Sequence, residues 1–195
     1  MVCRDRYAEP GYLVQIFGRW MLPHGTLVLG GAASGKSEYA ENLFHNSELN
    51  LIYLATGQIF DAEVAERVET HRARRDARWL TIEAPFDPGA PLANLSEEDG
   101  VLIDCATMWL SNLMMEDRDV AAAQNDLLGH LGACRARWVV VSNEVGHGIV
   151  PENALARRFR EAQGRLNIAL AAQANRVVQV IAGLPRVLKD ETGKA

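Results

Sequence analysis

The sequence predicts a three-layer α/β fold with a mostly parallel central sheet, and two patterns support this prediction. Five short runs are apolar nearly throughout, which is typical of strands buried on both faces. Helical stretches separate these runs, and this alternation implies right-handed crossovers between parallel strands. The expected strands are residues 26–29, 50–55, 101–104, 138–142 and 177–182, with 81–83 as a weaker sixth candidate.

The helices are expected in the gaps between these runs, at residues 36–44, 61–75, 107–115 and 120–137. The longest helix is expected to begin at Pro151, because proline fits the first turn of a helix. Five apolar residues then recur at helical spacing and predict a stripe that faces the core. They are Leu155, Phe159, Ala162, Leu166 and Leu170.

Length and composition indicate a single domain. The chain has 195 residues, of which 48% are hydrophobic and 23% charged. A domain of this size buries roughly 70% of the surface that its unfolded chain exposes. We therefore expect one domain at 25–195, after an irregular N-terminal extension at 1–24, with a polar surface connection at 87–100.

Charge and cysteine content argue against several classes of protein. The formal net charge of −5 disfavours a nucleic-acid binder, which needs a basic excess to neutralise phosphates. No apolar run approaches the roughly 18 residues of a membrane span, and the N-terminus lacks the apolar core of a signal peptide. The three cysteines have neither CxxC nor zinc-ligand spacing. Free thiols in the cytoplasm are the expectation.

A glycine-rich segment that matches GxxxxGK[ST] lies between the first expected strand and the first expected helix. Glycines allow successive backbone N–H groups to converge on phosphate oxygens. In such a loop Lys36 reaches the terminal phosphates, and the hydroxyl of Ser37 binds Mg²⁺. The pattern predicts a P-loop NTPase-like fold. The expected nucleotide-binding residues are Gly30, Gly31, Ala32, Ala33, Ser34, Gly35, Lys36 and Ser37.

A second acidic position is expected at the end of another strand. Asp104 closes the apolar run VLID, where its carboxylate would help to orient Mg²⁺. The alternative is an ordinary aspartate that caps the next helix. The chain has no NKxD motif, which a regulatory GTPase would need, and its length favours a small-molecule kinase or a nucleotidyltransferase.

Six further stretches carry a more specific resemblance. They are LGGAASGKSEYAE (29–41), YLATGQIFDAEVAERVETHRARR (53–75), WLTIEAP (79–85), VLIDCATMWLSNLM (101–114), VSNEVGHGIVPENALARRFREAQGRLN (141–167) and AGLPRVLK (182–189). Together they resemble the bifunctional adenosylcobinamide kinase/adenosylcobinamide-phosphate guanylyltransferase family of cobalamin biosynthesis. The stretch at 141–167 is the most specific, because a generic P-loop protein has no need of NEVGxGIVPEN.

The resemblance implies two reactions on one scaffold. The first phosphorylates adenosylcobinamide from ATP or GTP. The second transfers GMP from GTP to adenosylcobinamide phosphate through a histidine–GMP intermediate, which gives adenosyl-GDP-cobinamide and pyrophosphate. The matching histidine is His71, and Lys36 is the second expected catalytic residue. The resemblance also implies a homo-oligomer, specifically a trimer, with Mg²⁺ as cofactor.

The residues around His71 are compatible with this role. A neutral imidazole is a competent nucleophile toward an α-phosphate. His71 also shares a helix face with Val64 and Val68, so a histidine packed in the core is the alternative reading. Several arginines lie nearby and could neutralise triphosphate charge. These are Arg67, Arg72, Arg74, Arg75 and Arg78.

Further nucleotide contacts follow from the resemblance alone. They are Thr56, Gly57, Gln58, Arg72, Ala73, Arg74, Arg75, Glu83 and Asp104. Asn143 and Glu144 follow an expected strand and act on substrate or metal, or else only cap the loop. Arg165 and Asn167 flank the apolar stripe of the long helix and serve a substrate or subunit contact, or are merely solvated.

The chain departs from the family pattern at a few positions. Ala33 stands where the family commonly has arginine, Asp76 where proline is usual, and His147 where methionine is common. Residues 1–20 are additional, and Met21 would make a natural start. These departures bear on efficiency more than on the type of reaction.

Two other functions remain open at the level of the sequence. One is a P-loop kinase of another small alcohol, which would not need His71. The other is a nucleotide-dependent regulatory protein without turnover. Only the bifunctional enzyme requires both the P-loop and a histidine that carries GMP.

Overall fold

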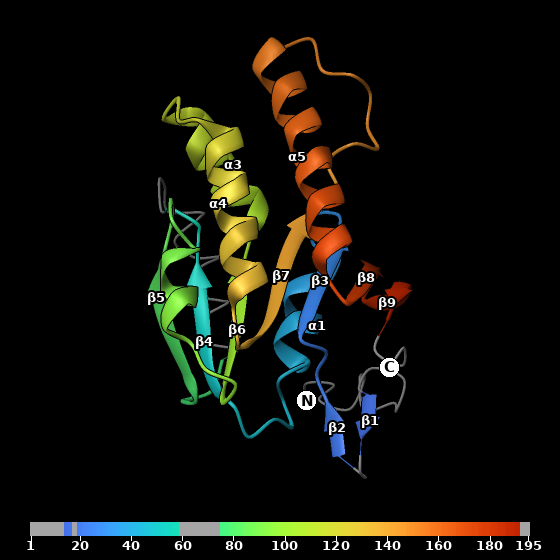
Figure 1. Ribbon diagram of the computed structural model, residues 1–195. Helices are drawn as coiled ribbons and strands as arrows, with labels where there is room; N and C mark the ends of the chain where they lie inside the picture. The colour runs from blue at the N-terminus through green and yellow to red at the C-terminus, as the bar shows by residue number, and fades with distance from the viewer. Residues whose placement is uncertain (1–13, 17–18, 59–74, 192–195) are drawn as a thin grey trace.

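The computed structural model describes residues 14–16, 19–58 and 75–191 of the chain (Figure 1). The main sheet contains β3 (Gly25–Gly30), β4 (Asn50–Ala55), β5 (Trp79–Glu83), β6 (Asp99–Asp104), β7 (Arg137–Asn143), β8 (Arg176–Ile181) and β9 (Leu184–Asp190). The helices are α1 (Lys36–Asn42), α3 (Ala106–Met115), α4 (Val120–Ala133), α5 (Ala154–Gln173) and the short 3₁₀ helix η1 (Ala90–Asn94).

The strands form one seven-stranded sheet in the order β5-β4-β6-β7-β3-β8-β9. All neighbouring pairs are parallel except β8 and β9, which run antiparallel. The mostly parallel sheet expected from the sequence is therefore confirmed, and each of the six expected strands is present within two residues of its expected ends. Within this sheet, β9 is the strand that sequence reasoning missed.

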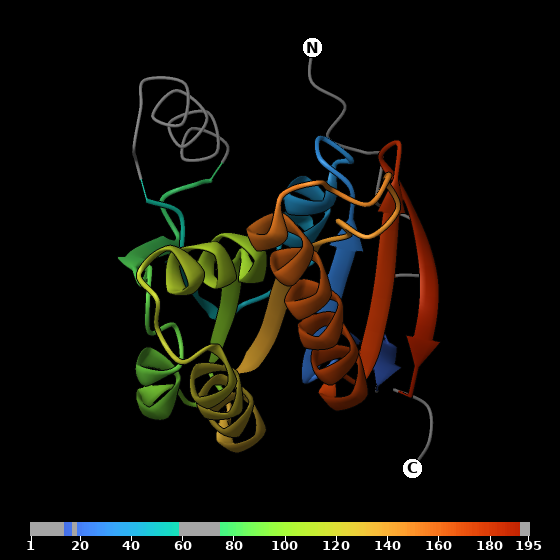
Figure 2. The same ribbon diagram turned by 90° about the horizontal axis from the view of Figure 1, so that it is seen from above.

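Helices cover both faces of the sheet and give the three layers (Figure 2). The helix α1 packs on one face, where Tyr39 and Phe44 meet strand residues such as Val28 and Leu102. The helices α3, α4 and α5 pack on the opposite face, with Trp109 of α3 fully buried there. Because side chains alternate along each strand, both faces of the inner strands must be apolar. This explains the continuous apolar runs in the sequence.

The long helix begins later than the sequence suggested. The helix α5 begins at Ala154, and the side chain of Asn153 caps it by accepting hydrogen bonds from the amides of Leu155 and Ala156. Pro151 therefore lies before the helix, and its carbonyl accepts a hydrogen bond from Arg157 instead. The expected start at Pro151 is wrong because asparagine supplies the stronger N-terminal signal.

The apolar stripe of α5 is only partly confirmed. Leu166 and Leu170 are fully buried and Phe159 is partly buried, whereas the side chain of Leu155 is exposed. The first turn of α5 thus extends beyond the core. The helix α4 is also shorter than expected, because it ends at Ala133 and leaves Arg137 to begin β7.

Two segments expected to lack regular structure contain short elements. Within 1–24, β1 (Val14–Ile16) and β2 (Arg19–Met21) pair as an antiparallel hairpin. The connection at 87–100 contains η1, whose Leu92 is buried against the core. The helix expected at 61–75 lies outside the described residues, apart from Arg75.

Candidate functional site

The P-loop joins the carboxyl end of β3 to the first residue of α1, as the motif predicts. The strand ends at Gly30 and the helix begins at Lys36, with Gly35 as its N-cap. Gly35 has φ of 90°, a conformation that residues with a Cβ rarely adopt. A Cβ there would also lie 3.2 Å from the Cα of Gly183, so glycine is required for two reasons.

The P-loop leaves hydrogen-bond donors available. No side chain caps the N-terminus of α1, so its first amides are not taken by a capping group. The ammonium of Lys36 donates a 3.2 Å hydrogen bond to the carbonyl of Gly31, which folds the lysine back over the loop. Converging amides and an ammonium group form a cationic cradle suited to a triphosphate.

Two segments that are distant in the sequence form backbone hydrogen bonds to the P-loop. The amide of Gly183, in the turn between β8 and β9, donates to the carbonyl of Ser34 at 2.8 Å. The amide of Glu144, just after β7, donates to the carbonyl of Gly30 at 3.1 Å. The loop conformation therefore depends on backbone contacts far away in the sequence.

Asp104 lies at the carboxyl end of β6, on the same edge of the sheet as the P-loop. One carboxylate oxygen, Oδ2, accepts a 3.0 Å hydrogen bond from the hydroxyl of Tyr53. Burial, together with the neighbouring carboxylate of Asp104, raises the pKa of Tyr53 far above its ordinary value. The phenol therefore stays protonated and donates to Asp104 throughout the physiological pH range.

Thr56 follows β4, but its side chain is committed to the fold. It is fully buried, and its hydroxyl accepts from the amide of Cys105 and donates to the carbonyl of Cys105, both at 2.7 Å. Burial raises the pKa of the Cys105 thiol to about 11, so this cysteine is not a thiolate nucleophile at neutral pH. The next two residues, Gly57 and Gln58, are exposed and half-buried.

Four expected nucleotide-site residues lie outside the described part of the chain. They are His71, Arg72, Ala73 and Arg74. The chain is described again from Arg75, whose guanidinium lies 3.6 Å from the centre of the Tyr53 ring. The side chain of Arg75 is only 6% exposed, and its Nη1 is 3.9 Å from Oε1 of Glu41 in α1.

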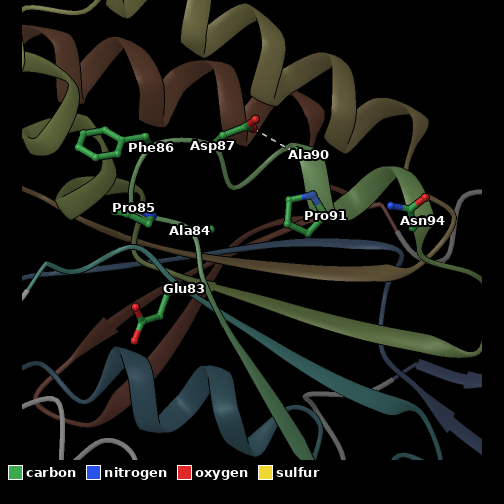
Figure 3. A pocket seen from close by; sticks show the side chains of 8 residues that line it. All are labelled: Glu83, Ala84, Pro85, Phe86, Asp87, Ala90, Pro91 and Asn94. Carbon is green, nitrogen blue, oxygen red and sulfur yellow. Dashed lines mark hydrogen bonds between the residues drawn. The ribbon is translucent and has the colours of Figure 1, made fainter.

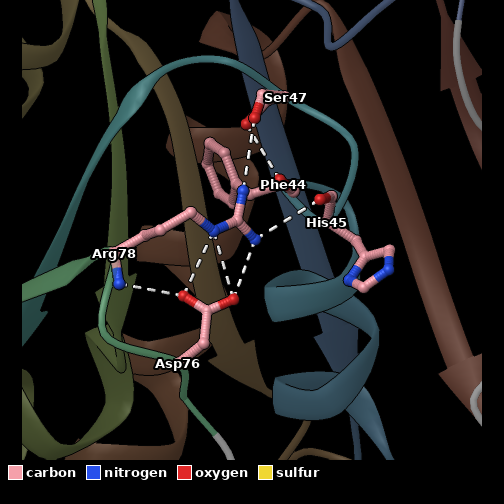
Figure 4. Close-up of polar contacts among 5 residues, drawn as sticks. All are labelled: Phe44, His45, Ser47, Asp76 and Arg78. Atoms are coloured by element: carbon pink, nitrogen blue, oxygen red, sulfur yellow. Dashed lines mark hydrogen bonds and ion pairs between the residues drawn. The ribbon is translucent and has the colours of Figure 1, made fainter.

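Asp76, the position where the family usually has proline, forms a local ion pair (Figure 4). Its carboxylate accepts hydrogen bonds from the guanidinium and the backbone amide of Arg78. These hydrogen bonds from Arg78 hold the pKa of Asp76 below its usual value. Arg78 also donates to the carbonyls of His45 and Ser47, beyond the end of α1. Arg78 thus serves chain packing at this end of the sheet rather than the nucleotide site.

Glu83 ends β5 and is paired in register with Ala55 of β4. It lines an open pocket of about 480 Å³ together with Phe86, Asp87 and Pro91. In Figure 3 the carboxylate of Glu83 points toward α1, away from Phe86 and Asp87 on the other side of the strand. Glu83 therefore faces the same side of the sheet as Tyr53, and the other lining residues do not.

A buried polar network ties the end of β7 to α5. The amide of Gln163, which is fully buried, donates to the hydroxyl of Ser142 and to Oδ1 of Asn167, both at 2.9 Å. Asn167 in turn donates to the carbonyl of Asn143 at 3.1 Å. Asn167 is therefore not a solvated helix position. Arg165, by contrast, is exposed and pairs with Glu161 on the outer face of α5.

Glu144 and His147 lie beside the P-loop. The carboxylate of Glu144 accepts two hydrogen bonds from the amide of Gln179, at 3.0 and 2.9 Å. The ring of His147 is largely exposed, with its Nε2 3.5 Å from Glu144. Glu144 thus links the segment after β7 to β8 and does more than cap its own loop.

Sequence reasoning missed Tyr53 and Gln163. Tyr53 stands within an apolar strand, where an aromatic residue normally indicates core packing. Gln163 stands on the buried side of α5 and belongs to no motif. A polar residue between Phe159 and Leu166, on the face of the apolar stripe, is the one signal that could have found Gln163.

The described residues contain no group of three or more histidine, cysteine or acidic side chains placed to hold a metal ion. None of the helices in the described ranges is long and apolar enough to cross a membrane.

The mostly parallel sheet, the glycine-rich loop after the inner strand β3 and the carboxylate at the end of β6 define a P-loop nucleotide-binding protein of the α/β class. Two solved structures share this fold. A type III secretion system ATPase has a TM-score of 0.55 at 9% identity, over 85% of this chain and 57% of that chain. The RadB recombinase has a TM-score of 0.50 at 15% identity, over 82% of this chain and 76% of that chain.

The sequence comparisons identify the family. Residues 26–188 match the model of the cobinamide kinase / cobinamide phosphate guanyltransferase family. The bifunctional adenosylcobalamin biosynthesis protein CobP of Pseudomonas aeruginosa is 43% identical over 85% of this chain and 97% of its own length. The corresponding CobU of Escherichia coli is 40% identical over 81% of this chain and 96% of its own length. The chain belongs to this family of bifunctional transferases.

Proposed function

We propose that this enzyme phosphorylates adenosylcobinamide with ATP or GTP and then transfers GMP from GTP to the resulting phosphate. The observation that carries the proposal is the P-loop itself. It lies between β3 and α1, with Lys36 folded over uncapped helix amides, inside a region that matches the family from residue 26 to 188. Family membership supports the two substrates, and the loop supports their common triphosphate.

In the kinase step, the hydroxyl of the cobinamide side chain attacks the γ-phosphorus of the bound triphosphate. The bond between this phosphorus and the β,γ-bridging oxygen breaks, and the nucleoside diphosphate leaves. Negative charge grows on the bridging oxygen, where the ammonium of Lys36 and the loop amides stabilise it. The hydroxyl proton passes to a base or to solvent.

In the guanylyl transfer, an imidazole nitrogen of His71 attacks the α-phosphorus of GTP. The bond to the pyrophosphate oxygen breaks, and a phosphoramidate between His71 and GMP forms. An oxygen of adenosylcobinamide phosphate then displaces the histidine and forms the new pyrophosphate bond. Arg72, Arg74 and Arg75 are proposed to balance the triphosphate charge during this step.

Magnesium fits the residues at this site. Oδ2 of Asp104 is held by Tyr53, and Oδ1 makes no hydrogen bond to any described residue. The hydroxyl of Ser37, in the first turn of α1, is the other protein ligand proposed. Oxygen ligands of this kind suit Mg²⁺, which completes its shell with water and phosphate. When bound, the ion would neutralise charge on the phosphates of the substrate.

We also propose the remaining nucleotide contacts that the family resemblance implies. The structure divides them by whether their polar groups are accessible. Gly57, Gln58 and Glu83 have accessible groups near the strand ends. Thr56 is fully buried, with its hydroxyl bound to Cys105, its amide to the carbonyl of Asp104 and its carbonyl to the side chain of Asn112, so its role is to shape the strand end. The free thiols of Cys105 and Cys134 support a reducing location, which we propose is the cytoplasm. A homotrimer remains part of the proposal.

The histidine–GMP intermediate gives the decisive test. The protein is incubated with GTP that carries a radioactive α-phosphate, and the label retained on the protein is measured after acid and alkali treatment. We expect alkali-stable, acid-labile label on the wild type and none on His71→Ala. His130→Ala is the matched control, because His130 lies on α4, on the opposite face of the sheet from α1.

Two results would contradict the proposal. Label on His71→Ala would remove this residue as the nucleophile. Label transferred to an acceptor only from the γ-phosphate, with full activity in His71→Ala, would instead indicate a simple kinase of another small alcohol.

A further inference from the structure

Tyr53 lies at the centre of β4, and its side chain reaches toward the edge of the sheet that carries the P-loop. The register pairs Tyr53 with Leu102 of β6, and Asp104 follows Leu102 on the same face. The hydroxyl of Tyr53 therefore meets the carboxylate of Asp104 across two strands, at 3.0 Å. Only 6% of Tyr53 is exposed, so no water competes freely for this hydrogen bond.

The ring of Tyr53 is held from its face and its edge. The guanidinium of Arg75 lies over the ring at 3.6 Å, a cation–π contact. The indole of Trp79 meets it at 84°, with 6.3 Å between the ring centres. Arg75 is where the described chain resumes after 59–74, the segment that contains His71. The side chain of Tyr53 thus contacts both the carboxylate of Asp104 and the guanidinium of Arg75.

We propose that Tyr53 is a positioning residue for the nucleotide-bound enzyme: its hydroxyl fixes the carboxylate of Asp104 for Mg²⁺, and its ring seats Arg75 for the triphosphate. The proposal rests on the function proposed above, which makes Asp104 a metal ligand. A hydrogen bond to one oxygen of a carboxylate fixes its rotation and so directs the other oxygen. Partners of this kind typically change metal affinity by about 10- to 100-fold when they are removed.

Different substitutions separate the role of the Tyr53 hydroxyl from the role of the Tyr53 ring. Tyr53→Phe removes the hydroxyl and keeps the ring beneath Arg75. Tyr53→Leu removes both the hydroxyl and the aromatic face. Tyr39→Phe is the matched control. Tyr39 is a buried tyrosine of α1, and it belongs to the same hydrophobic cluster as Tyr53, on the same face of the sheet.

The experiment measures the affinity for a fluorescent GTP analogue, first in chelator and then at saturating Mg²⁺. The ratio of the two affinities reports the contribution of the ion without any turnover. We expect Tyr53→Phe to keep the metal-free affinity and to reduce this ratio by roughly tenfold. Tyr53→Leu should reduce the ratio equally and also weaken metal-free binding several-fold, because Arg75 loses its seat.

Asp104→Asn and the double variant complete the test. If the hydroxyl acts through Asp104, Tyr53→Phe should have no further effect on the ratio in the Asp104→Asn background. Thermal melting of each variant without nucleotide separates a folding defect from a change in this ratio.

Three outcomes would overturn the inference. In the first, the affinity ratio of Tyr53→Phe equals that of the wild type or of Tyr39→Phe, while the ratio of Asp104→Asn is strongly reduced. This result would contradict the positioning role of Tyr53 and leave the metal role of Asp104 in place. An unchanged ratio in Asp104→Asn removes the metal role of Asp104, and the inference with it. A wild-type protein that does not bind the GTP analogue contradicts the proposed function itself.

Discussion

Lys36 and Thr56 differ in how far their polar atoms are already hydrogen-bonded within the protein. The hydroxyl of Thr56 both donates and accepts, and it is fully buried against Cys105. The ammonium of Lys36 makes one 3.2 Å hydrogen bond, to a carbonyl of its own loop. Two of its three donors are thus left for phosphate oxygens. Position in a motif counts for less than whether the polar atoms are already satisfied.

Lys36→Ala should therefore slow both half-reactions. The loss of one positive donor from the developing charge at the phosphates should lower the rate by roughly a hundredfold or more. The checks are the initial rate of phosphate transfer to adenosylcobinamide and the yield of labelled GMP-enzyme. A retained kinase rate would contradict the proposed role of the loop. Thermal melting should be close to that of the wild type, because within the described residues the ammonium of Lys36 makes a single hydrogen bond, to a carbonyl of its own loop.

Asp76 gives a pH-dependent prediction. Hydrogen bonds from Arg78 lower the pKa of Asp76 in the folded protein, so its contribution to stability is present above the unfolded pKa near 4. This contribution is lost as the pH falls through the lower, folded pKa. Urea unfolding between pH 6 and pH 3 should show a shallower loss of stability in Asp76→Asn than in the wild type. Because Asp76 is exposed, the difference should be small and should shrink in high salt.

The elements around the site are joined by polar contacts that run between strand ends and helices. On the α5 side, Gln163 and Asn167 reach Ser142 and the backbone of Asn143. These contacts fix the segment after β7, whose Glu144 amide supports Gly30 of the P-loop. A helix that shares no residue with the loop thus helps to hold it.

Gln163→Leu should show how much the hydrogen bonds between α5 and the end of β7 contribute to stability. The substitution keeps the size of the side chain but removes its hydrogen bonds to Ser142 and Asn167, both of which remain buried or half-buried. We expect the free energy of unfolding to fall by about 1–3 kcal/mol. Gln173→Leu is the matched control on the same helix, where the side chain is half-buried and donates to the carbonyl of Leu128. An equal loss in both variants, measured by urea denaturation, would contradict a special role for the network.

Element boundaries show which sequence signals are reliable. Buried strands were predicted well, because the apolar runs have the length of strands and are too short for most helices. The start of α5 was misplaced because Pro151 was weighed above the Asn153 cap. The strand β9 was missed because it lies at the edge of the sheet, where its residues are mostly exposed and its pattern is not apolar. The place of the P-loop between a strand and a helix could be predicted from its motif, whereas contacts such as Tyr53–Asp104 depend on strand register, which one sequence does not reveal.

At the scale of the whole molecule, β3 and β7 pack closely where β3 begins. Gly25 begins β3 against the fully buried Trp138 of β7, and a Cβ on Gly25 would lie 2.3 Å from the indole ring. The ring belongs to the rigid core beside strands, so it cannot give way cheaply. The first residue of the P-loop strand is therefore set by a neighbouring tryptophan.

Gly25→Ala should destabilise the entire fold. Overpacking of this kind costs about 1–3 kcal/mol. Gly129→Ala provides the contrast, because Gly129 lies exposed in α4 with open space around its Cβ position. That change should stabilise the protein by about 0.5–1 kcal/mol through helix propensity. Opposite shifts of the melting temperature would support this account, and a neutral Gly25→Ala would contradict it.

The hydrogen bond from the amide of Gly183 to the carbonyl of Ser34 means that the turn between β8 and β9 helps to hold the P-loop in place. Truncation of the chain after Ile181 would remove the amide of Gly183 and with it this hydrogen bond to the P-loop. We expect such a truncated form to lose activity because the P-loop is less well held. Such a loss should not be mistaken for a missing active-site residue.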